Sequence, residues 1–195
     1  MTGKNSTMKK LRYDLPYIGR LAGTLLGICL VVALLLGVVN AITAPIITRL
    51  QQEKNAAAMG RVLVAESYEP MSVELENVLS MHRAITGGEQ IGYVVEVKGS
   101  GFGGAMTLIV GVDMEGKVTG VEVTKHAETS GVGTKVTNDA SVLGRFTGMT
   151  GGFAVVKAAT GDPNEVVAIT GATVSSNAVG TAVEIALRAV ASVNE

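Results

Sequence analysis

The side chains best suited to chemistry lie together near the end of the chain. An apolar run ends at the segment TGAT, residues 170–173, and a predicted helix follows it with Ser175 in its first turn. A hydroxyl at this point can cap a helix by accepting hydrogen bonds from the first backbone N–H groups. Those N–H groups and the partial positive charge of a helix N-terminus can instead bind a phosphate, to which Thr173 would offer its hydroxyl. Gly171 and Ala172 would leave space beside it, so the local sequence supports both interpretations.

Other residue types that usually carry chemistry are scarce or wrongly spaced. The chain has one Cys and two His, too few for a closed zinc site or a cysteine-ligated iron–sulfur cluster. It has neither a Gly-x-Ser-x-Gly nucleophile motif nor a Gly-x4-Gly-Lys-Ser/Thr phosphate loop. The stretch GSGFGG, residues 99–104, leads into a predicted strand, which favours a turn or bulge over a dinucleotide fingerprint and leaves close approach to a flat ligand as the alternative. We therefore assign no catalytic residue and no metal ligand.

A second motif, HAETSGVG at residues 126–133, favours the phosphate interpretation. With TGAT it resembles a family of flavin-binding proteins: the G subunit of the Rnf-type ion-translocating ferredoxin:NAD oxidoreductase and the related C subunit of the sodium-translocating NADH:quinone reductase. In that family, the last threonine of a Ser/Thr-Gly-Ala-Thr signature carries FMN through a phosphoester, and a His-x-Glu-Thr-Pro-Gly-x-Gly loop lies beside the flavin. The resemblance implies covalent FMN on Thr173. It further implies a cofactor site lined by Thr170, Gly171, Ala172, Ser175, Glu128, Thr129, Gly131 and Gly133.

The resemblance covers nearly the whole chain and implies an electron-transfer subunit that works with the other subunits of a membrane redox complex. A flavin transferase would attach the FMN during maturation. Two positions differ from the family pattern, because Ser130 replaces a proline and Val167 replaces the aspartate of the transferase's recognition pattern.

The quinone-reductase C subunit is the near alternative, although such subunits tend to be longer. The alternative from another class is a membrane-anchored extracytoplasmic sensor or binding module without a cofactor, which has no need of the Thr173 hydroxyl.

The element that would hold such a site at a lipid bilayer is a long apolar segment. Residues 21–48 contain no charged residue, and a helix needs about 20 apolar residues to cross a bilayer core. The run is longer than the apolar core of a secretory signal, which predicts an uncleaved transmembrane helix at residues 21–44. Pro45 is expected to end this helix in the membrane interface.

The charges on either side of the apolar segment predict its orientation. Basic residues dominate the preceding segment, residues 1–20, whereas the chain after residue 50 has 10 basic and 16 acidic residues. Basic segments stay on the cytoplasmic side of a membrane. We therefore expect a single-pass protein of the cell inner membrane with a cytoplasmic N-terminus and an extracytoplasmic main domain. The acidic balance of that domain argues against binding of nucleic acid.

The rest of the chain predicts an α+β protein, in which a single N-terminal transmembrane helix precedes a mixed-sheet FMN-binding domain. Residues 45–90 are expected to form a helical linker and the entry to the domain, and residues 91–195 the domain itself. Runs of β-branched residues predict a sheet of about five strands, two of which form a hairpin about the turn MEGK. Two apolar runs flank a turn at residues 161–164, and an amphipathic pattern predicts a last helix at residues 175–194.

Overall fold

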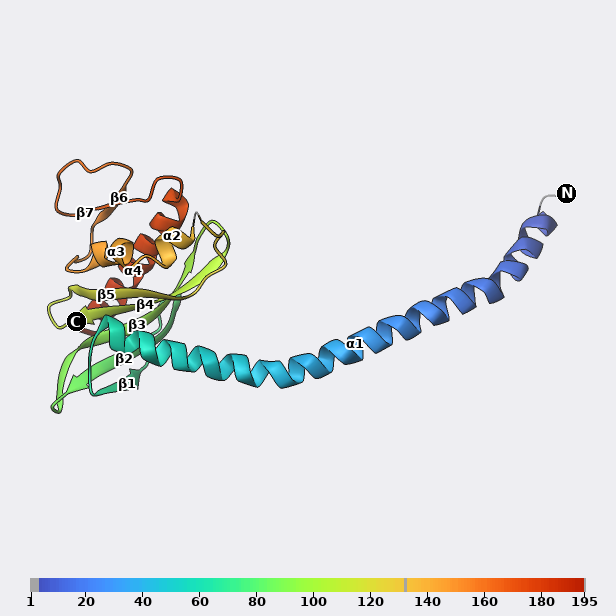
Figure 1. Ribbon diagram of the computed structural model, residues 1–195, viewed down its shortest axis with the longest axis horizontal. Coiled ribbons are helices and arrows are strands. Elements are labelled where there is room, and N and C mark those ends of the chain that lie inside the picture. Colours follow the sequence, from blue (N-terminus) through green and yellow to red (C-terminus); the bar gives the residue numbers. More distant parts are fainter. Residues whose placement is uncertain (1–3, 132, 195) are drawn as a thin grey trace. The chain divides into compact units, whose positions relative to one another are not determined.

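The computed structural model describes residues 4–131 and 133–194, with side chains from Tyr17 onward. The start of the predicted cytoplasmic segment, its basic side chains before Arg20, and Val132 of the HAETSGVG motif therefore lie outside the described residues. The chain divides into two units, Met1–Leu50 and Gln51–Glu195 (Figure 1). The predicted domain limits after residues 20, 44 and 90 stay predictions.

The first element is a single helix, α1, which spans Lys4–Val62. Among the described residues, it is the one helix long and apolar enough to cross a membrane, with a mean hydropathy of 2.8 in its most apolar part. We expected Pro45 to end the helix, and this expectation is wrong, because α1 continues through it. A proline removes one backbone hydrogen bond, and the strong helix formers that follow it, QQEKNAAAM, extend the helix regardless.

Five strands follow α1: β1 Ser67–Met71, β2 Val78–Thr86, β3 Glu89–Ser100, β4 Ala105–Asp113 and β5 Val118–Lys125. They form one antiparallel sheet in sequence order, so each strand pairs with its neighbours along the chain. The turn between β2 and β3 contains Gly87 and Gly88, both with positive φ, a conformation that glycine adopts at little steric cost. The predicted strand after Ile91 and the hairpin about MEGK are confirmed.

The sequence did not reveal β1 and β2, which lie in the segment expected to be a helical linker and domain entry. β1 is short and contains Pro70, which is tolerated there because β1 is an edge strand of the sheet. β2 carries His82 and Arg83 between its apolar residues, so its alternation of apolar and polar positions is obscured. Both strands are recognised only through their pairing with the strongly apolar β3.

The remaining elements are α2 Thr134–Thr137, α3 Ala140–Leu143, η1 Gly144–Phe146, β6 Ala154–Val156, β7 Glu165–Val167 and α4 Thr173–Asn194. The two apolar runs around residues 161–164 form β6 and β7, which pair in parallel as a separate two-stranded sheet. Parallel neighbours cannot be joined by a tight hairpin, so the connection between them is a wide loop. Among the described residues, parallel pairing is confined to β6 and β7, and the α+β fold class is confirmed.

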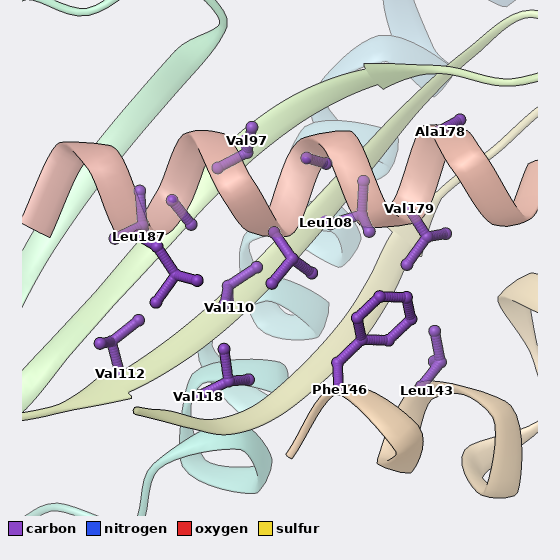
Figure 2. Packing of buried hydrophobic residues seen from close by; sticks show 14 of the residues in the cluster. Val97, Leu108, Val110, Val112, Val118, Leu143, Phe146, Ala178, Val179 and Leu187 are labelled. Carbon is purple, nitrogen blue, oxygen red and sulfur yellow. The ribbon is translucent and has the colours of Figure 1, made fainter. Parts of the chain in front are cut away.

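Helix α4 covers one face of the five-stranded sheet and forms one side of the main core. Its predicted apolar stripe is confirmed, because all its members are buried: Val179, Ala182, Val183, Ala186, Leu187 and Val190. This stripe packs against buried residues of β3, β4 and β5 and against Phe146 of η1 (Figure 2). At the end of α4, the Tyr93 hydroxyl donates a hydrogen bond of 2.6 Å to Asn194 Oδ1. The last helix is therefore fixed to β3 at its C-terminal end.

The last turns of α1 pack on the opposite face of the same sheet. Ala58 and Val62 form a small apolar cluster with Val94 of β3 and Ile109 of β4. Val94 alternates along β3 with residues of the main core, so it points to the other face of the sheet. The segment from Gln51 to Val62 is thus part of the domain core, although it continues a helix that begins far upstream.

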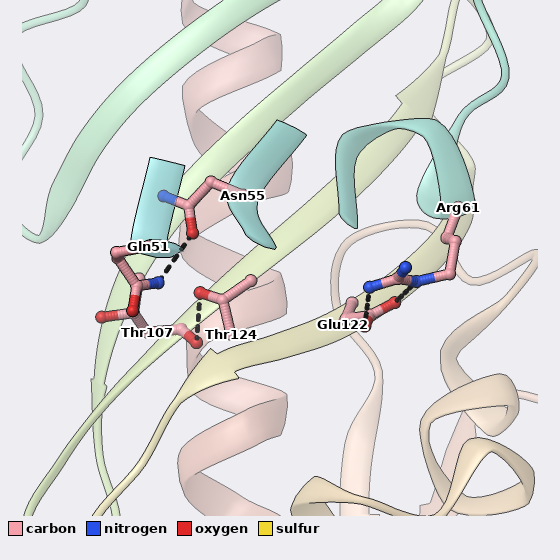
Figure 3. A network of polar contacts seen from close by, with 6 residues as sticks. All are labelled: Gln51, Asn55, Arg61, Thr107, Glu122 and Thr124. Carbon is pink, nitrogen blue, oxygen red and sulfur yellow. Dashed lines mark hydrogen bonds and ion pairs between the residues drawn. The ribbon is translucent and has the colours of Figure 1, made fainter. Parts of the chain in front are cut away.

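Polar contacts accompany this packing (Figure 3). Gln51 Nε2 donates to Asn55 Oδ1 at 2.9 Å, and Asn55 Nδ2 donates to Glu96 Oε1 at 2.8 Å. The Arg61 guanidinium donates to both carboxylate oxygens of Glu122, at 2.7 and 2.5 Å. Arg61 is largely exposed, and exposed ion pairs add little stability. We therefore attribute the fixed position of this segment mainly to its apolar contacts.

Helix α1 lies directly against the sheet at Gly111, and we expect Gly111→Ala to destabilise the domain. A Cβ at this position would lie 2.7 Å from the Val62 carbonyl oxygen, so the helix or the strand would have to move. Overpacking of this kind costs about 1–3 kcal/mol, which should lower the urea midpoint of the full chain in detergent. Gly144→Ala is the matched control, because a Cβ there meets nothing within 4 Å. Equal midpoints for the two variants would contradict the close approach.

Candidate functional site

Three segments that are far apart in the sequence meet at one cavity of about 370 Å³, a size typical of small-molecule sites. The first segment is the turn between β3 and β4, the second is the loop after β5, and the third is the junction between β7 and α4. The residues that line the cavity are Phe102, Glu128, Thr129, Gly133, Gly171, Ala172, Thr173, Val174 and Ser175.

The N-terminus of α4 forms one wall of this cavity, because the helix begins at Thr173. Gly171 has a φ of +83°, which lets the chain turn sharply into the helix without side-chain strain. The first N–H groups of a helix have no acceptor within it and carry a partial positive charge. Here these groups belong to Thr173, Val174 and Ser175, so an anion in the cavity would find hydrogen-bond donors and a favourable field.

The hydroxyls near this helix end have different partners, and those of Thr173 and Ser175 do not cap it. The residue that precedes the helix is Ala172, which has no side-chain acceptor. Ser175 Oγ instead donates to Glu128 Oε2 at 2.9 Å, and Ser176 Oγ bonds two backbone groups of the preceding turn. Thr173 Oγ1 makes no hydrogen bond with any residue that the structure describes. The capping interpretation therefore does not hold, and the Thr173 hydroxyl is available to a ligand.

Glu128 connects the three segments that form the cavity. Its side chain is buried, and its carboxylate accepts hydrogen bonds from Ser175 Oγ on Oε2 and from the Gly103 N–H on Oε1, the latter at 3.3 Å. A Cβ at Gly101 or Gly133 would collide with this carboxylate, and a Cβ at Gly103 would collide with the backbone next to Glu128. These three glycines therefore leave the space that a buried glutamate needs beside the helix end.

The structure brings most of the predicted site residues together. Those that line the cavity are Gly171, Ala172, Thr173, Ser175, Glu128, Thr129 and Gly133. Thr170 and Gly131 do not line it: both are exposed, and the Gly131 N–H donates to Thr134 Oγ1 at 2.9 Å. Sequence reasoning missed Phe102 and Val174, two exposed apolar residues of the cavity wall, since single apolar residues give no periodic signal. Among the described residues, no group of three or more His, Cys, Asp or Glu could hold a metal ion.

Residues 101–188 match the protein family described as FMN-binding domain, and this stretch contains every residue that lines the cavity. The fold and the site therefore define an FMN-binding domain that follows a long apolar helix. The chain is 30% identical over 151 residues to the G subunit of the proton-translocating ferredoxin:NAD(+) oxidoreductase complex of Clostridium ljungdahlii, covering 77% of this chain and 80% of the relative. The chain belongs to the family of G subunits of ion-translocating ferredoxin:NAD(+) oxidoreductase complexes.

Two further relatives extend the comparison. The G subunit of the Na(+)-translocating ferredoxin:NAD(+) oxidoreductase complex of Acetobacterium woodii is 29% identical over 198 residues, which cover 93% of this chain and 96% of the relative. Among solved structures, the chain resembles the crystal structure of Shewanella oneidensis NqrC with a TM-score of 0.48 at 22% identity, over 61% of this chain and 63% of that one.

The cavity fits the chemistry of FMN. The free N–H groups at the start of α4 suit a phosphate, and the Thr173 hydroxyl lies at the same wall. Phe102 and Val174 give the cavity apolar surface that suits a flat ring, and Thr129 adds a hydroxyl. The residues present can therefore hold both the charged and the apolar parts of this cofactor.

Proposed function

We propose that this protein is the electron-transfer subunit of a membrane-bound ion-translocating ferredoxin:NAD oxidoreductase, with FMN held in the cavity and joined to Thr173 Oγ1 by a phosphoester. The observation that carries the proposal is the convergence of two sequence motifs on one cavity, at whose wall the Thr173 hydroxyl has no partner among the described residues. The relatives that match over most of the chain are named as G subunits of such complexes. This favours the G subunit over the quinone-reductase C subunit and over a sensor without a cofactor.

The residues of the cavity have separate parts in this function. The N–H groups at the start of α4 hold the phosphodiester, whose remaining negative charge the helix N-terminus stabilises by about 0.3–1 kcal/mol. Glu128 fixes the loop after β5 to the β3–β4 turn and to α4, so the walls keep their positions. Bound FMN supplies the redox chemistry, and the protein supplies position and electrostatics.

A flavin transferase would form the bond at Thr173, and Val167 gives a way to test its recognition of this chain. Val167 replaces the aspartate that the resemblance implies three residues before Thr170, and its carbonyl oxygen accepts from Arg145 Nη1 at 2.7 Å. We expect Val167→Asp to raise the fraction of chains that carry FMN when the transferase is limiting, as measured by intact mass. The nearby guanidinium should make the new carboxylate tolerable to the fold.

Val156→Asp is the matched control for this prediction. Val156 pairs with Val167 in the β6–β7 ladder and is also half-buried, but it lies outside the signature. It should leave FMN loading unchanged or lower it. If Val167→Asp loads no more FMN than the wild type, the transferase does not use an acid at this position.

The membrane topology belongs to the same proposal. The apolar part of α1 would cross the membrane once, with the basic N-terminal segment in the cytoplasm and the FMN domain outside it. A covalent bond has a purpose there, because FMN that dissociated outside the cytoplasm would be lost by dilution. A reporter enzyme that is active only outside the cytoplasm should be active when fused after Glu195. Activity only of a cytoplasmic reporter would contradict the orientation.

The function itself is tested with membranes from a strain that lacks this chain. Such membranes should lose ferredoxin-dependent reduction of NAD, and the wild-type chain should restore it. Thr173→Ala should not restore it, even though the complex assembles and the variant copurifies with the other subunits. Full activity of membranes without the chain would overturn the proposed function.

A further inference from the structure

Phe102 is the largest apolar side chain of the cavity wall, and packing within the fold does not explain it. Its side chain is 76% exposed, whereas Phe146 is buried in the main core and Phe153 packs against that core. The chain has three Phe and no Trp, so it exposes its one remaining phenylalanine at the mouth of this cavity. Exposed aromatic residues at a cavity are typical of contacts with a ligand.

The backbone that carries Phe102 is held firmly on both sides. The Gly101 N–H donates to the Gly104 carbonyl oxygen at 2.9 Å, which closes the turn between β3 and β4. The Gly103 N–H donates to the buried carboxylate of Glu128. Gly101 and Gly103 also lie too close to Glu128 and its neighbours to accept a side chain. The backbone of the turn therefore holds Phe102 in a fixed position at the cavity.

A second apolar side chain comes from the helix that would carry the cofactor. Val174 lies next to Thr173 in the first turn of α4, lines the same cavity and is 54% exposed. Gly171 and Ala172 add only small groups to the wall between these positions. The cavity wall thus contains a bulky aromatic residue, a branched aliphatic residue and two small residues that leave space between them. This combination suits a flat aromatic ring.

A phosphoester at Thr173 would fix only one end of FMN. The ring is separated from that bond by a flexible chain, so it needs a contact of its own to keep one orientation. We propose that Phe102 provides this contact by stacking on the flavin ring, with Val174 in contact with the ring from the helix. The proposal rests on the proposed function, since it requires FMN in this cavity. It assigns to Phe102 a positioning role that neither motif indicates.

The first test uses fluorescence of the loaded full-length protein. Phe102→Trp and the control Met114→Trp are each expressed with a flavin transferase, and FMN occupancy is measured by intact mass. An indole in contact with the ring donates an electron to the excited flavin and shortens its fluorescence lifetime. Met114 follows the far end of β4, about 30 Å along the strand from the Phe102 turn. We expect Phe102→Trp to shorten the flavin lifetime and Met114→Trp to leave it unchanged.

The second test measures affinity without the covalent bond. In the Thr173→Ala background, added FMN is titrated by the change in its fluorescence. Loss of aromatic stacking should raise the Kd of Phe102→Ala by about tenfold, and Phe102→Tyr should restore it. If this background binds no FMN, the lifetime test decides alone.

The outcomes separate the inference from the proposed function. Absence of FMN from the wild-type chain after expression with the transferase would overturn the proposed function and the inference together. Normal loading with equal lifetimes in Phe102→Trp and Met114→Trp would overturn only the stacking role. A shortened lifetime in both Trp variants would also count against it, because the effect would then not depend on contact with the cavity.

Discussion

Thr173→Ala should abolish covalent FMN completely, whereas Thr170→Ala should retain it. Both threonines belong to the TGAT signature, but only Thr173 lines the cavity, and Thr170 is exposed outside it. The full chain, expressed with a flavin transferase, is run on a denaturing gel under ultraviolet light and analysed by intact mass. We expect the wild type and Thr170→Ala to be fluorescent and heavier by one FMN less water, and Thr173→Ala to be dark.

The stability of the FMN-free protein against urea provides the control for this experiment. Thr173 Oγ1 makes no hydrogen bond within the described part of the chain, so removing it should leave the urea midpoint of the FMN-free protein nearly unchanged. A dark Thr173→Ala protein with an unchanged midpoint has lost only the attachment point. Fluorescence retained by Thr173→Ala, or lost equally from both variants, would show that the bond lies elsewhere.

Glu128→Ala should have the second large effect, on stability and on FMN loading together. The substitution removes the acceptor of the Gly103 N–H and of Ser175 Oγ and empties the space between three glycines. Leaving a buried donor unsatisfied costs about 1–3 kcal/mol. The urea midpoint should fall, and the occupancy of FMN should fall with it, because the three segments of the cavity are no longer connected.

Glu165→Ala is the matched control for Glu128→Ala. Glu165 also accepts two hydrogen bonds, from Thr160 N at 2.9 Å and Thr160 Oγ1 at 2.8 Å, but these lie at an exposed turn. Its loss should change the unfolding free energy by no more than about 0.5 kcal/mol. If Glu128→Ala is as stable and as well loaded as Glu165→Ala, the buried carboxylate does not hold the site together.

The two sequence motifs predicted residues that the fold brings to one cavity, among them Thr173 and Glu128. Their roles in holding FMN stay predictions, because they come from the resemblance to the family. The glycines of GSGFGG predict a turn or bulge, with close approach to a flat ligand as the alternative, and the structure has a turn there between β3 and β4. That these glycines lie against Glu128 could not be predicted, because the two segments are brought together by the pairing of β4 with β5. The TGAT motif predicts Thr170 in the site together with its neighbours, but Thr170 does not line the cavity, and Gly171, which follows it, has a left-handed backbone.

In the rest of the fold, the elements with a clear local sequence pattern were predicted, and those that depend on contacts with distant segments were not. An amphipathic pattern predicted α4, and runs of β-branched residues on either side of the MEGK turn predicted the hairpin of β4 and β5. Strands β1 and β2 have mixed composition, and their conformation depends on the strands with which they pair. Pro45 was a local signal that the surrounding helix formers outweighed.

The first and the last helix of the domain both form hydrogen bonds with β3, which limits when during synthesis the domain can fold. Asn55 binds Glu96 on one side of β3, and Tyr93 binds Asn194, 101 residues further along the chain. The domain therefore cannot complete its packing until the last turn of α4 has been synthesised and, in the proposed topology, has crossed the membrane. We expect the transferase to act only on finished molecules, so a chain that stalls during export should never acquire its flavin.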